Sequence, residues 1–177
     1  MTEYIDVVNK DGTPTGDTKT RVEIHSGSYW HNVVHVYIFR KKGVGLEFLV
    51  HLRSKDKDSN PDKWDARSGG HVKAGETIED TVITELKEEI GMSVEYKDMI
   101  HGFVKSYDWP NNYERISVYY YPFDGDISSL KFNDGEVQEA KWMAMEDILI
   151  ELQDSTKWSG GVKGFQEAVE DLKKKIR

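Results

Sequence analysis

The sequence predicts a single α/β domain over residues 1–177, and three observations favour it. Apolar runs typical of strands alternate with segments whose apolar residues recur at helical spacing. No stretch rich in proline, glycine or serine divides the chain, and no segment is repeated. The length suffices for one sizeable hydrophobic core.

Strands are predicted wherever an apolar or alternating run is bounded by turn residues. These runs are, in chain order, residues 4–8, 18–24, 33–39, 46–52, 93–107, 115–123 and 136–143. The first two surround the turn-rich stretch 9–16, and residues 1–30 are interpreted as an N-terminal extension of strands and turns. The third and fourth flank the sequence Arg-Lys-Lys-Gly-Val-Gly, which predicts a buried hairpin. A polar loop over residues 54–65 follows this hairpin.

Three helices are predicted. A short helix covers residues 145–152, and an amphipathic helix covers residues 164–177, with cationic residues at its end, where they favour the helix dipole. The third helix begins after Thr77, which with Asp80 is a typical N-terminal cap, and it ends at Gly91. Its apolar stripe consists of Ile78, Val82, Leu86 and Ile90.

This third helix concentrates acidic residues beside its apolar stripe. At about 100° per residue, Glu89 lies at the edge of the buried face, and Glu85 and Glu88 lie next to it. Like charges at this spacing destabilise a helix by roughly 0.2–0.5 kcal/mol per pair, unless they are protonated or bind a cation. Hard divalent cations prefer carboxylate oxygens. A solvated acidic face is the alternative interpretation of the cluster taken alone.

The spacing of glycine and glutamate residues in and before this helix is a more specific signal of function than its acidic charge. Gly70 is followed after five residues by Glu76, and after seven more by Thr84-Glu85-Leu86-Lys87-Glu88-Glu89-Ile90-Gly91-Met92. This pattern closely resembles the signature of the Nudix hydrolases, so residues 70–92 are identified as a Nudix box. The clear departure is Thr84, because the family has an arginine there that pairs with the glutamates and orients them.

The resemblance implies a fold and a chemistry. The fold would be a mixed β-sheet sandwiched between helices, with the box as a loop–helix–loop. The chemistry would be hydrolysis of a diphosphate linked to a further group, assisted by Mg²⁺ or Mn²⁺. The metal ligands would be Glu85, Glu88, Glu89 and the Gly70 carbonyl. Glu88 or Glu89 is expected to be the general base, with Glu139 as an outside candidate because some members use a glutamate beyond the box.

A finer resemblance covers much of the rest of the chain. Residues 3–16, 21–39, 51–65 and 69–71 are similar to the Nudix branch that includes isopentenyl-diphosphate isomerase. Matched by position, the diphosphate-binding cations of that enzyme fall on Arg21, Arg53 and Lys57. Its metal ligands fall on His25, His31, His71 and Glu114, which together imply a second metal site. The alternatives are a lysine that is merely solvated at position 57 and histidines that are only hydrogen-bonded structure.

The isomerase reaction itself is disfavoured. The chain contains no cysteine, and Gly69 stands where the isomerase has its catalytic cysteine. Ile116 stands at the position of its second active-site glutamate, whereas the box glutamates, which isomerases typically lose, are complete. The sequence therefore favours a hydrolase-type member of this branch. A catalytically weak, ligand-binding Nudix domain is the alternative, because of Thr84.

The group attached to the diphosphate is less constrained. Five aromatic residues either stack a nucleobase or belong to the core, namely Tyr29, Trp30, Tyr107, Trp109 and Tyr113. A nucleoside diphosphate derivative is the first expectation for the substrate. A prenyl or other small diphosphate is the second.

Composition argues against several other classes of protein. A net charge of −8 argues against broad binding of nucleic acid, and the absence of cysteine excludes disulfides and thiolate metal sites. The first residues lack the basic start and apolar run of a signal peptide, and no segment approaches the roughly 20 apolar residues that span a bilayer. We therefore expect a cytoplasmic protein that acts on a small-molecule diphosphate and does not bind membranes. The family resemblance leaves a homodimer open, although no feature of the sequence marks an interface.

Overall fold

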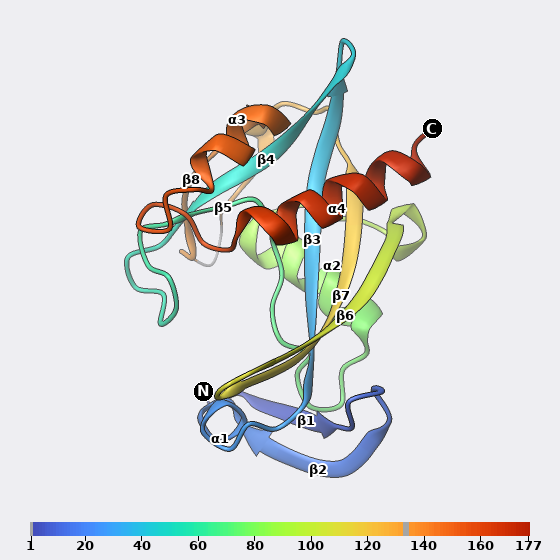
Figure 1. Ribbon diagram of the computed structural model, residues 1–177, viewed down its shortest axis with the longest axis vertical. Helices are drawn as coiled ribbons and strands as arrows, with labels where there is room; N and C mark the ends of the chain where they lie inside the picture. Colours follow the sequence, from blue (N-terminus) through green and yellow to red (C-terminus); the bar gives the residue numbers. More distant parts are fainter. Residues whose placement is uncertain (1, 133–134) are drawn as a thin grey trace.

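The computed structural model describes residues 2–132 and 135–177, so Met1 and residues 133–134 of the predicted domain lie outside it (Figure 1). The strands are β1 (Tyr4–Val8), β2 (Pro14–Thr20), β3 (His31–Lys42), β4 (Gly45–Arg53), β5 (Trp64–Asp65), β6 (Ile100–Trp109), β7 (Asn112–Pro122) and β8 (Val137–Ala144). The helices are α1 (Arg21–Ser26), α2 (Ile78–Glu89), α3 (Met145–Glu151) and α4 (Val162–Lys175), with 3₁₀ turns at Tyr96–Asp98 and Ile127–Ser129. None of the helices in these described ranges is long and apolar enough to cross a bilayer.

A six-stranded mixed sheet forms the centre of the molecule. Its strand order is β5-β4-β3-β7-β6, and β8 also pairs with β4. Strands β3 and β7 run parallel, whereas the other pairs in this sheet are antiparallel. Strands β1 and β2 form a separate hairpin, which lies with α1 at one end of the molecule (Figure 1).

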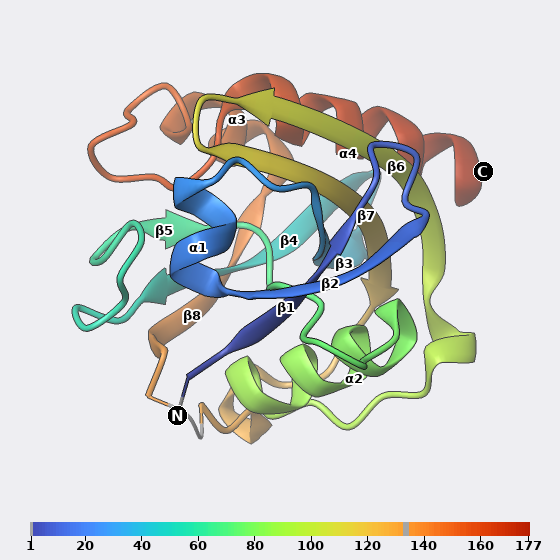
Figure 2. The ribbon, with the colours of Figure 1, turned by 90° about the horizontal axis from the view of Figure 1, so that it is seen from below.

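Two hydrophobic clusters cover the two faces of the central sheet. On one face, Val34 and Val36 of β3 pack with the apolar stripe of α2. On the other face, Val33 and Tyr37 of the same strand pack with α4. This division follows from the alternation of side chains along a strand. Figure 2 shows α2 and α4 on opposite sides of the sheet, so the predicted α/β class with a mixed sheet between helices is confirmed.

Two predicted strands differ from those in the structure. The strand predicted over residues 18–24 ends at Thr20, and α1 follows it. Thr20 caps this helix, because its side chain accepts a hydrogen bond from the Glu23 N–H and the Glu23 carboxylate accepts one from the Thr20 N–H. The helix also buries Ile24 completely, so local capping and packing outweigh the strand preference of its β-branched residues. The strand predicted over residues 93–107 is shorter at its start, because a 3₁₀ turn precedes β6.

Candidate active site

Helix α2 has the limits and the buried face that the sequence indicates. Thr77 caps its N-terminus, and the Thr77 side chain accepts a hydrogen bond from the Asp80 N–H. Its apolar stripe packs against β3, with no exposure at Leu86 or Ile90. Gly91 ends it with a φ of +73°, a left-handed conformation that favours glycine. These contacts fix the directions in which the box glutamates project.

Two of the three carboxylates predicted to bind the metal from α2 are turned inward, and the third is exposed. Glu89 is only 2% exposed, and its Oε2 accepts a hydrogen bond from the Gly69 N–H at 3.1 Å. Glu85 lies so close to Gly70 that a Cβ on this glycine would come within 2.7 Å of the Glu85 Oε1. Glycine is therefore needed at position 70 for the carboxylate to approach. Glu88 is exposed to solvent.

The inward carboxylates hold protons more tightly than ordinary glutamates do. Burial raises the pKa of Glu89 to about 8, and the neighbouring Glu85 adds to this shift. Burial likewise raises the pKa of Glu85 to about 7, although Lys73 acts in the opposite direction. A divalent cation must displace these protons in order to bind. The pair is therefore best suited to take up a cation above neutral pH.

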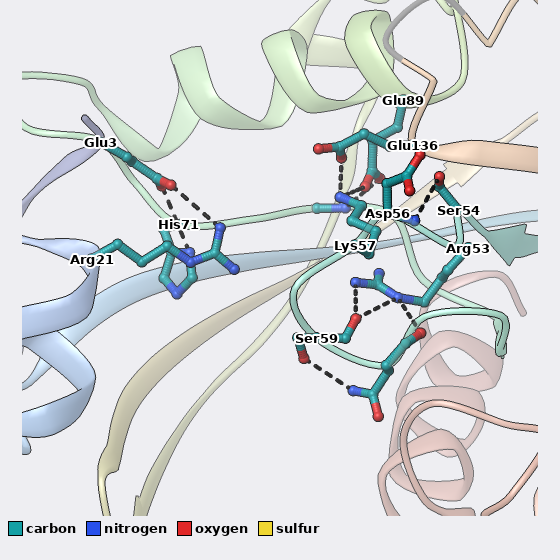
Figure 3. Close-up of polar contacts among 12 residues, drawn as sticks. Glu3, Arg21, Arg53, Ser54, Asp56, Lys57, Ser59, His71, Glu89 and Glu136 are labelled. Carbon is teal, nitrogen blue, oxygen red and sulfur yellow. Dashed lines mark hydrogen bonds and ion pairs between the residues drawn. The ribbon is translucent and has the colours of Figure 1, made fainter. Parts of the chain in front are cut away.

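Lys57 brings positive charge to this cluster (Figure 3). Its Nζ lies 3.5 Å from the Glu89 Oε1, and it is also ion-paired with Glu136. Lys57 lies in the loop between β4 and β5, close to Ser54, whose N–H donates to the Glu136 carbonyl at 2.7 Å. Of the three predicted diphosphate-binding cations, Lys57 is the one that the structure brings to the box.

The structure brings Glu136 to the box, and it does not bring the predicted Glu139 there. Glu139 is exposed and lies opposite Leu52 in the pairing of β4 with β8. Alternation along β8 places Glu139 on the same face as Met143, which packs on the α4 side of the sheet. Both glutamates lie near the start of one strand, so only the register of that strand distinguishes them. Sequence reasoning therefore missed Glu136.

The Gly70 carbonyl, which is the predicted backbone ligand, accepts a hydrogen bond from the Val34 N–H at 2.9 Å. A carbonyl oxygen has two lone pairs, so one remains for a cation. The hydrogen bond belongs to a short antiparallel pairing with β3, in which His71 lies opposite Val33 and Ser68 lies opposite Val36. This pairing holds the glycine pair next to α2.

Three of the predicted metal-binding histidines form a tight group. The ligand atoms of His25, His31 and His71 all lie within 4.8 Å of one another. The Nε2 atoms of His25 and His71 are 3.2 Å apart. The Nδ1 of His31 donates to the Tyr29 carbonyl at 2.9 Å, so the lone pair of this ring is on Nε2. That Nε2 is buried, and within the described part of the chain it has no hydrogen-bond partner.

His31 and His71 of this group are held in their neutral form. Burial lowers the pKa of His71 to about 2, and His31 and Arg21 act in the same direction. Burial also lowers the pKa of His31. A neutral imidazole with a free lone pair is the form that binds a transition metal. Glu114 lies beside His31 in the pairing of β3 with β7, but it is not part of the tight group.

The other two predicted diphosphate-binding cations have structural partners. Arg21 forms an ion pair with Glu3 at 3.4 Å, next to the histidine group (Figure 3). The Arg53 guanidinium donates to the backbone carbonyls of Ser59 and Asn60 and so shapes the loop between β4 and β5.

The histidine group and the box carboxylates lie on opposite faces of the sheet. His31 shares a face of β3 with Val33 by alternation, and His71 is paired opposite Val33. Val33 packs on the α4 side, whereas Val34 packs against the box helix. The segment 69–71 runs between the two groups, so one short backbone stretch contacts both.

The NUDIX domain family matches residues 29–162, which include the box and strands β3 to β8. The chain belongs to the NUDIX domain family. It is 42% identical over 92 residues to Nudix hydrolase 3 from Arabidopsis thaliana, covering 52% of this chain and 12% of that protein. It is 32% identical over 139 residues to an uncharacterised Nudix hydrolase from Clostridium acetobutylicum, covering 76% of this chain and 66% of that protein. The match spans less than two thirds of the length of either relative.

Isomerases of the Nudix family are relatives as well. The isopentenyl-diphosphate isomerase of Escherichia coli is 28% identical over 160 residues, covering 90% of this chain and 86% of that enzyme. The crystal structure of DR0079 from Deinococcus radiodurans has the same fold, with a TM-score of 0.76 at 21% identity over 94% of this chain and 99% of that one. The predicted membership of the Nudix hydrolase superfamily, with isomerase relatives, is confirmed.

The backbone of this Nudix chain has no room for the isomerase cysteine. Gly69 has a φ of +139°, and a Cβ at this position would overlap the Val34 carbonyl oxygen. Ile116, which replaces the second active-site glutamate, is 4% exposed and belongs to the core on the α4 side. One isomerase residue is thus sterically excluded, and the other has become part of the hydrophobic core.

Introducing the isomerase cysteine by Gly69→Cys is expected to lower the free energy of unfolding by about 2–3 kcal/mol and to give no isomerase activity. Gly43→Cys is the matched control, because Gly43 also has a positive φ, of +60°, but has open space around its Cβ position. Urea denaturation measures both variants. Equal losses in the two variants would show that the Val34 carbonyl moves aside easily.

A cavity of about 850 Å³ opens on the α4 side of the sheet. Two of the predicted aromatic residues, Tyr107 and Trp109, line it together with Ser59 and Asn60. Ser59 and Asn60 belong to the loop that carries Lys57 to the box. This loop therefore borders both the box carboxylates and the cavity.

Proposed function

We propose that this Nudix protein hydrolyses a diphosphate linkage in a nucleoside diphosphate derivative or a similar small diphosphate, in a reaction that depends on Mg²⁺ or Mn²⁺. The observation that carries the proposal is the placement of Glu85 and Glu89, which turn inward beside Gly69 and Gly70 with raised pKa values. Buried carboxylates are unfavourable unless a cation or a proton neutralises them, and perturbed carboxyl groups cluster at functional sites. The family and its hydrolase relatives support the same class of reaction.

The box residues would have two roles, to bind the cation and to accept a proton from water. Glu85, Glu88, Glu89 and the free lone pair of the Gly70 carbonyl would hold the cation, since Mg²⁺ prefers oxygen ligands. A cation bound there neutralises diphosphate charge and acidifies a water molecule. Either Glu88 or Glu89 would be the general base that accepts a proton from the attacking water. Lys57 would stabilise the diphosphate from the loop above the box.

The histidine group, with Glu114, would form a second cation site. The buried Nε2 of His31, which has no hydrogen-bond partner among the residues that the structure describes, fits this role, since a metal ion would satisfy it. Imidazole nitrogen suits ions such as Mn²⁺ or Zn²⁺ better than it suits Mg²⁺. Because His31 and the box lie on opposite faces of the sheet, the two ions would share no ligand.

A ligand-binding module without rapid turnover is the second candidate function, and Thr84 is the observation that favours it. An arginine at this position would lie one helical turn from Glu88, within reach of an ion pair. Thr84 offers only a hydroxyl group, so Glu88 lacks that partner. Ligand-induced thermal stabilisation without release of product would identify this function.

The test is a hydrolysis assay with and without Mg²⁺ over nucleoside diphosphates and triphosphates, nucleotide sugars, dinucleotide cofactors and prenyl diphosphates. Glu88→Gln is expected to lower turnover roughly 10- to 100-fold, because it removes a metal ligand that is already exposed and so leaves the fold intact. Glu139→Gln is the matched control and is expected to change nothing, because Glu139 is exposed on the other face of the sheet. Hydrolysis that persists in excess EDTA would contradict the proposal. Binding without hydrolysis of any compound would favour the second candidate.

A further inference from the structure

The charged groups around the α4-side cavity balance one another. Arg67 is paired with Asp65, and Lys105 is ion-paired with Glu167. The remaining charged residues of the wall are Lys163 and Glu114, and Glu114 is also the residue predicted for the second metal site. The cavity therefore has no net charge with which to attract a second phosphate or another anion. It is suited to a neutral group that makes specific hydrogen bonds.

Arg67 keeps a free edge of its guanidinium for such a group. Its Nε and one terminal nitrogen donate to the two carboxylate oxygens of Asp65, at 3.0 and 3.2 Å. Within the described residues, the other terminal nitrogen makes no hydrogen bond to protein. Asp65 is 4% exposed, and the Gly160 backbone passes so close that a Cβ there would come within 3.0 Å of the guanidinium. A guanidinium held in this way presents two parallel donors along its free edge.

Aromatic rings stand on another wall of the same cavity. Lys105, Tyr107 and Trp109 alternate along β6 and project from one face of the strand. Trp109 is 63% exposed, which is unusual for so large an apolar side chain. The Lys105 Nζ lies 4.5 Å from the centre of the Tyr107 ring and holds that ring from one side. Rings of this kind provide stacking surfaces for a planar base.

We propose that this cavity binds the base of a nucleotide substrate, and that Arg67 selects bases that present two adjacent acceptors. Guanine offers O6 and N7 as such a pair, and cytosine offers O2 and N3. In adenine, the ring acceptors N1 and N7 each lie next to the N6 amino group, which is a donor. In uracil, the N3–H donor lies between the two carbonyl acceptors O2 and O4. This inference rests on the proposed function, and it predicts that guanine and cytosine nucleotides are the substrates of the protein.

The position of the cavity relative to the box agrees with this assignment. Lys57 contacts Glu89 at the box, and Ser59, two residues further on, lines the cavity. Because the box carboxylates lie on the α2 side of the sheet and the cavity on the α4 side, the nucleotide would pass around this loop, with its diphosphate next to Lys57 and its base next to Arg67. The loop is held in this course by the hydrogen bonds from Arg53 to the Ser59 and Asn60 carbonyls.

The test is isothermal titration of the full chain in EDTA with the 5′-monophosphates of guanosine, cytidine, adenosine and uridine. Guanosine or cytidine monophosphate is expected to bind at least about 10-fold more tightly than the other two. Arg67→Lys retains a charge for Asp65 but removes the planar fork, so it should abolish most of this preference while thermal unfolding confirms that the variant is folded. Arg40→Lys is the matched control, because Arg40 is paired with Glu47 at a similar exposure but lies outside the cavity.

A second pair of variants tests the stacking wall. Trp109→Ala should lower the affinity for all four nucleotides by a similar factor, of about 5 or more, because stacking does not depend on base identity. Trp30→Ala should have no effect, since Trp30 packs on Tyr113 and does not line the cavity.

Three results would overturn the base assignment. These are equal affinity for all four nucleotides, a preference that survives Arg67→Lys, or tighter binding of dimethylallyl diphosphate than of any nucleotide. With any of these results, the proposed hydrolase function is still supported if the metal-dependent assay shows turnover. Because the titration is performed without metal, loss of hydrolysis alone leaves the base assignment standing.

Discussion

Replacing Glu89 by glutamine is expected to lower metal-dependent hydrolysis by roughly 10²- to 10⁴-fold while the protein remains folded. Glu89 is the most buried of the box carboxylates and accepts the Gly69 N–H, so it is held in one position beside the glycine pair. Glutamine has nearly the same volume and retains an oxygen for the Gly69 N–H. It carries no charge for a cation and accepts no proton from water. Steady-state turnover with saturating Mg²⁺ is the measurement, and activity within tenfold of the unmodified protein would exclude Glu89 from the chemistry.

Addition of Mg²⁺ at pH 8.5 should reverse the order of thermal stability between Glu89→Gln and the unmodified protein. Because the folded-state pKa of Glu89 is raised to about 8, its stabilising protonated form is lost as the pH rises from the ordinary glutamate range through 8. Metal-free Glu89→Gln is therefore expected to unfold at a higher temperature than the unmodified protein at pH 8.5. Mg²⁺ should stabilise the unmodified protein and leave the variant unchanged. Thermal unfolding at pH 6 and pH 8.5, with Mg²⁺ or EDTA, shows both effects.

Local signals account for the parts of the site that could be predicted from the sequence. The limits of α2 depend on the Thr77 cap and on Gly91, and its buried face depends on a four-residue apolar repeat. All of these are properties of neighbouring residues. They suffice to place Glu89 at the edge of the buried face, whereas the box itself is identified by its resemblance to the Nudix signature.

The parts that could not be predicted depend on how distant segments pair. Glu136 and Glu139 are equivalent by sequence, and the register of β8 on β4 brings only Glu136 to the box. Similarly, the placement of His71 and Gly70 on opposite faces follows from the pairing of residues 68–72 with β3. No periodicity within either segment specifies these pairings.

The partners of Lys57 in the structure differ from the one that the resemblance assigns to it. The resemblance assigns it to the diphosphate, whereas the structure pairs it with Glu89 and Glu136. The helix lacks an arginine at Thr84, so this loop lysine provides the positive charge next to the inward carboxylates. A bound cation and a diphosphate would change these pairings, because like charges repel and phosphate attracts the ammonium group.

Acidification from pH 6 to pH 5 is expected to destabilise the metal-free protein, because several of its histidines are held in the neutral form. Burial is the main cause in each case: it lowers the pKa of His35 to about 3, of His51 to about 4 and of His71 to about 2, and it lowers the pKa of His31 as well. Unfolded histidine titrates near pH 6.5, so below this pH the unfolded state binds more protons than the folded state. Stability therefore falls as the pH drops from about 6.5 toward the folded-state values.

The change in stability per pH unit follows from the difference between the number of protons bound in the unfolded state and in the folded state. Near pH 5.5 the histidines whose pKa values are lowered to about 4 or below, His35, His51 and His71, favour unfolding. Glu85 and Glu89, with pKa values raised to about 7 and 8, are protonated in the folded state and oppose it. The net difference is about one proton, or roughly 1.4 kcal/mol per pH unit. Urea denaturation at pH 7, 6 and 5 measures this slope. His51→Phe should remove about one proton from it, because His51 is 2% exposed, and the exposed control His101→Gln should not change it. No loss of stability between pH 6 and pH 5 would mean that water or a rearrangement reaches the His35, His51 and His71 rings.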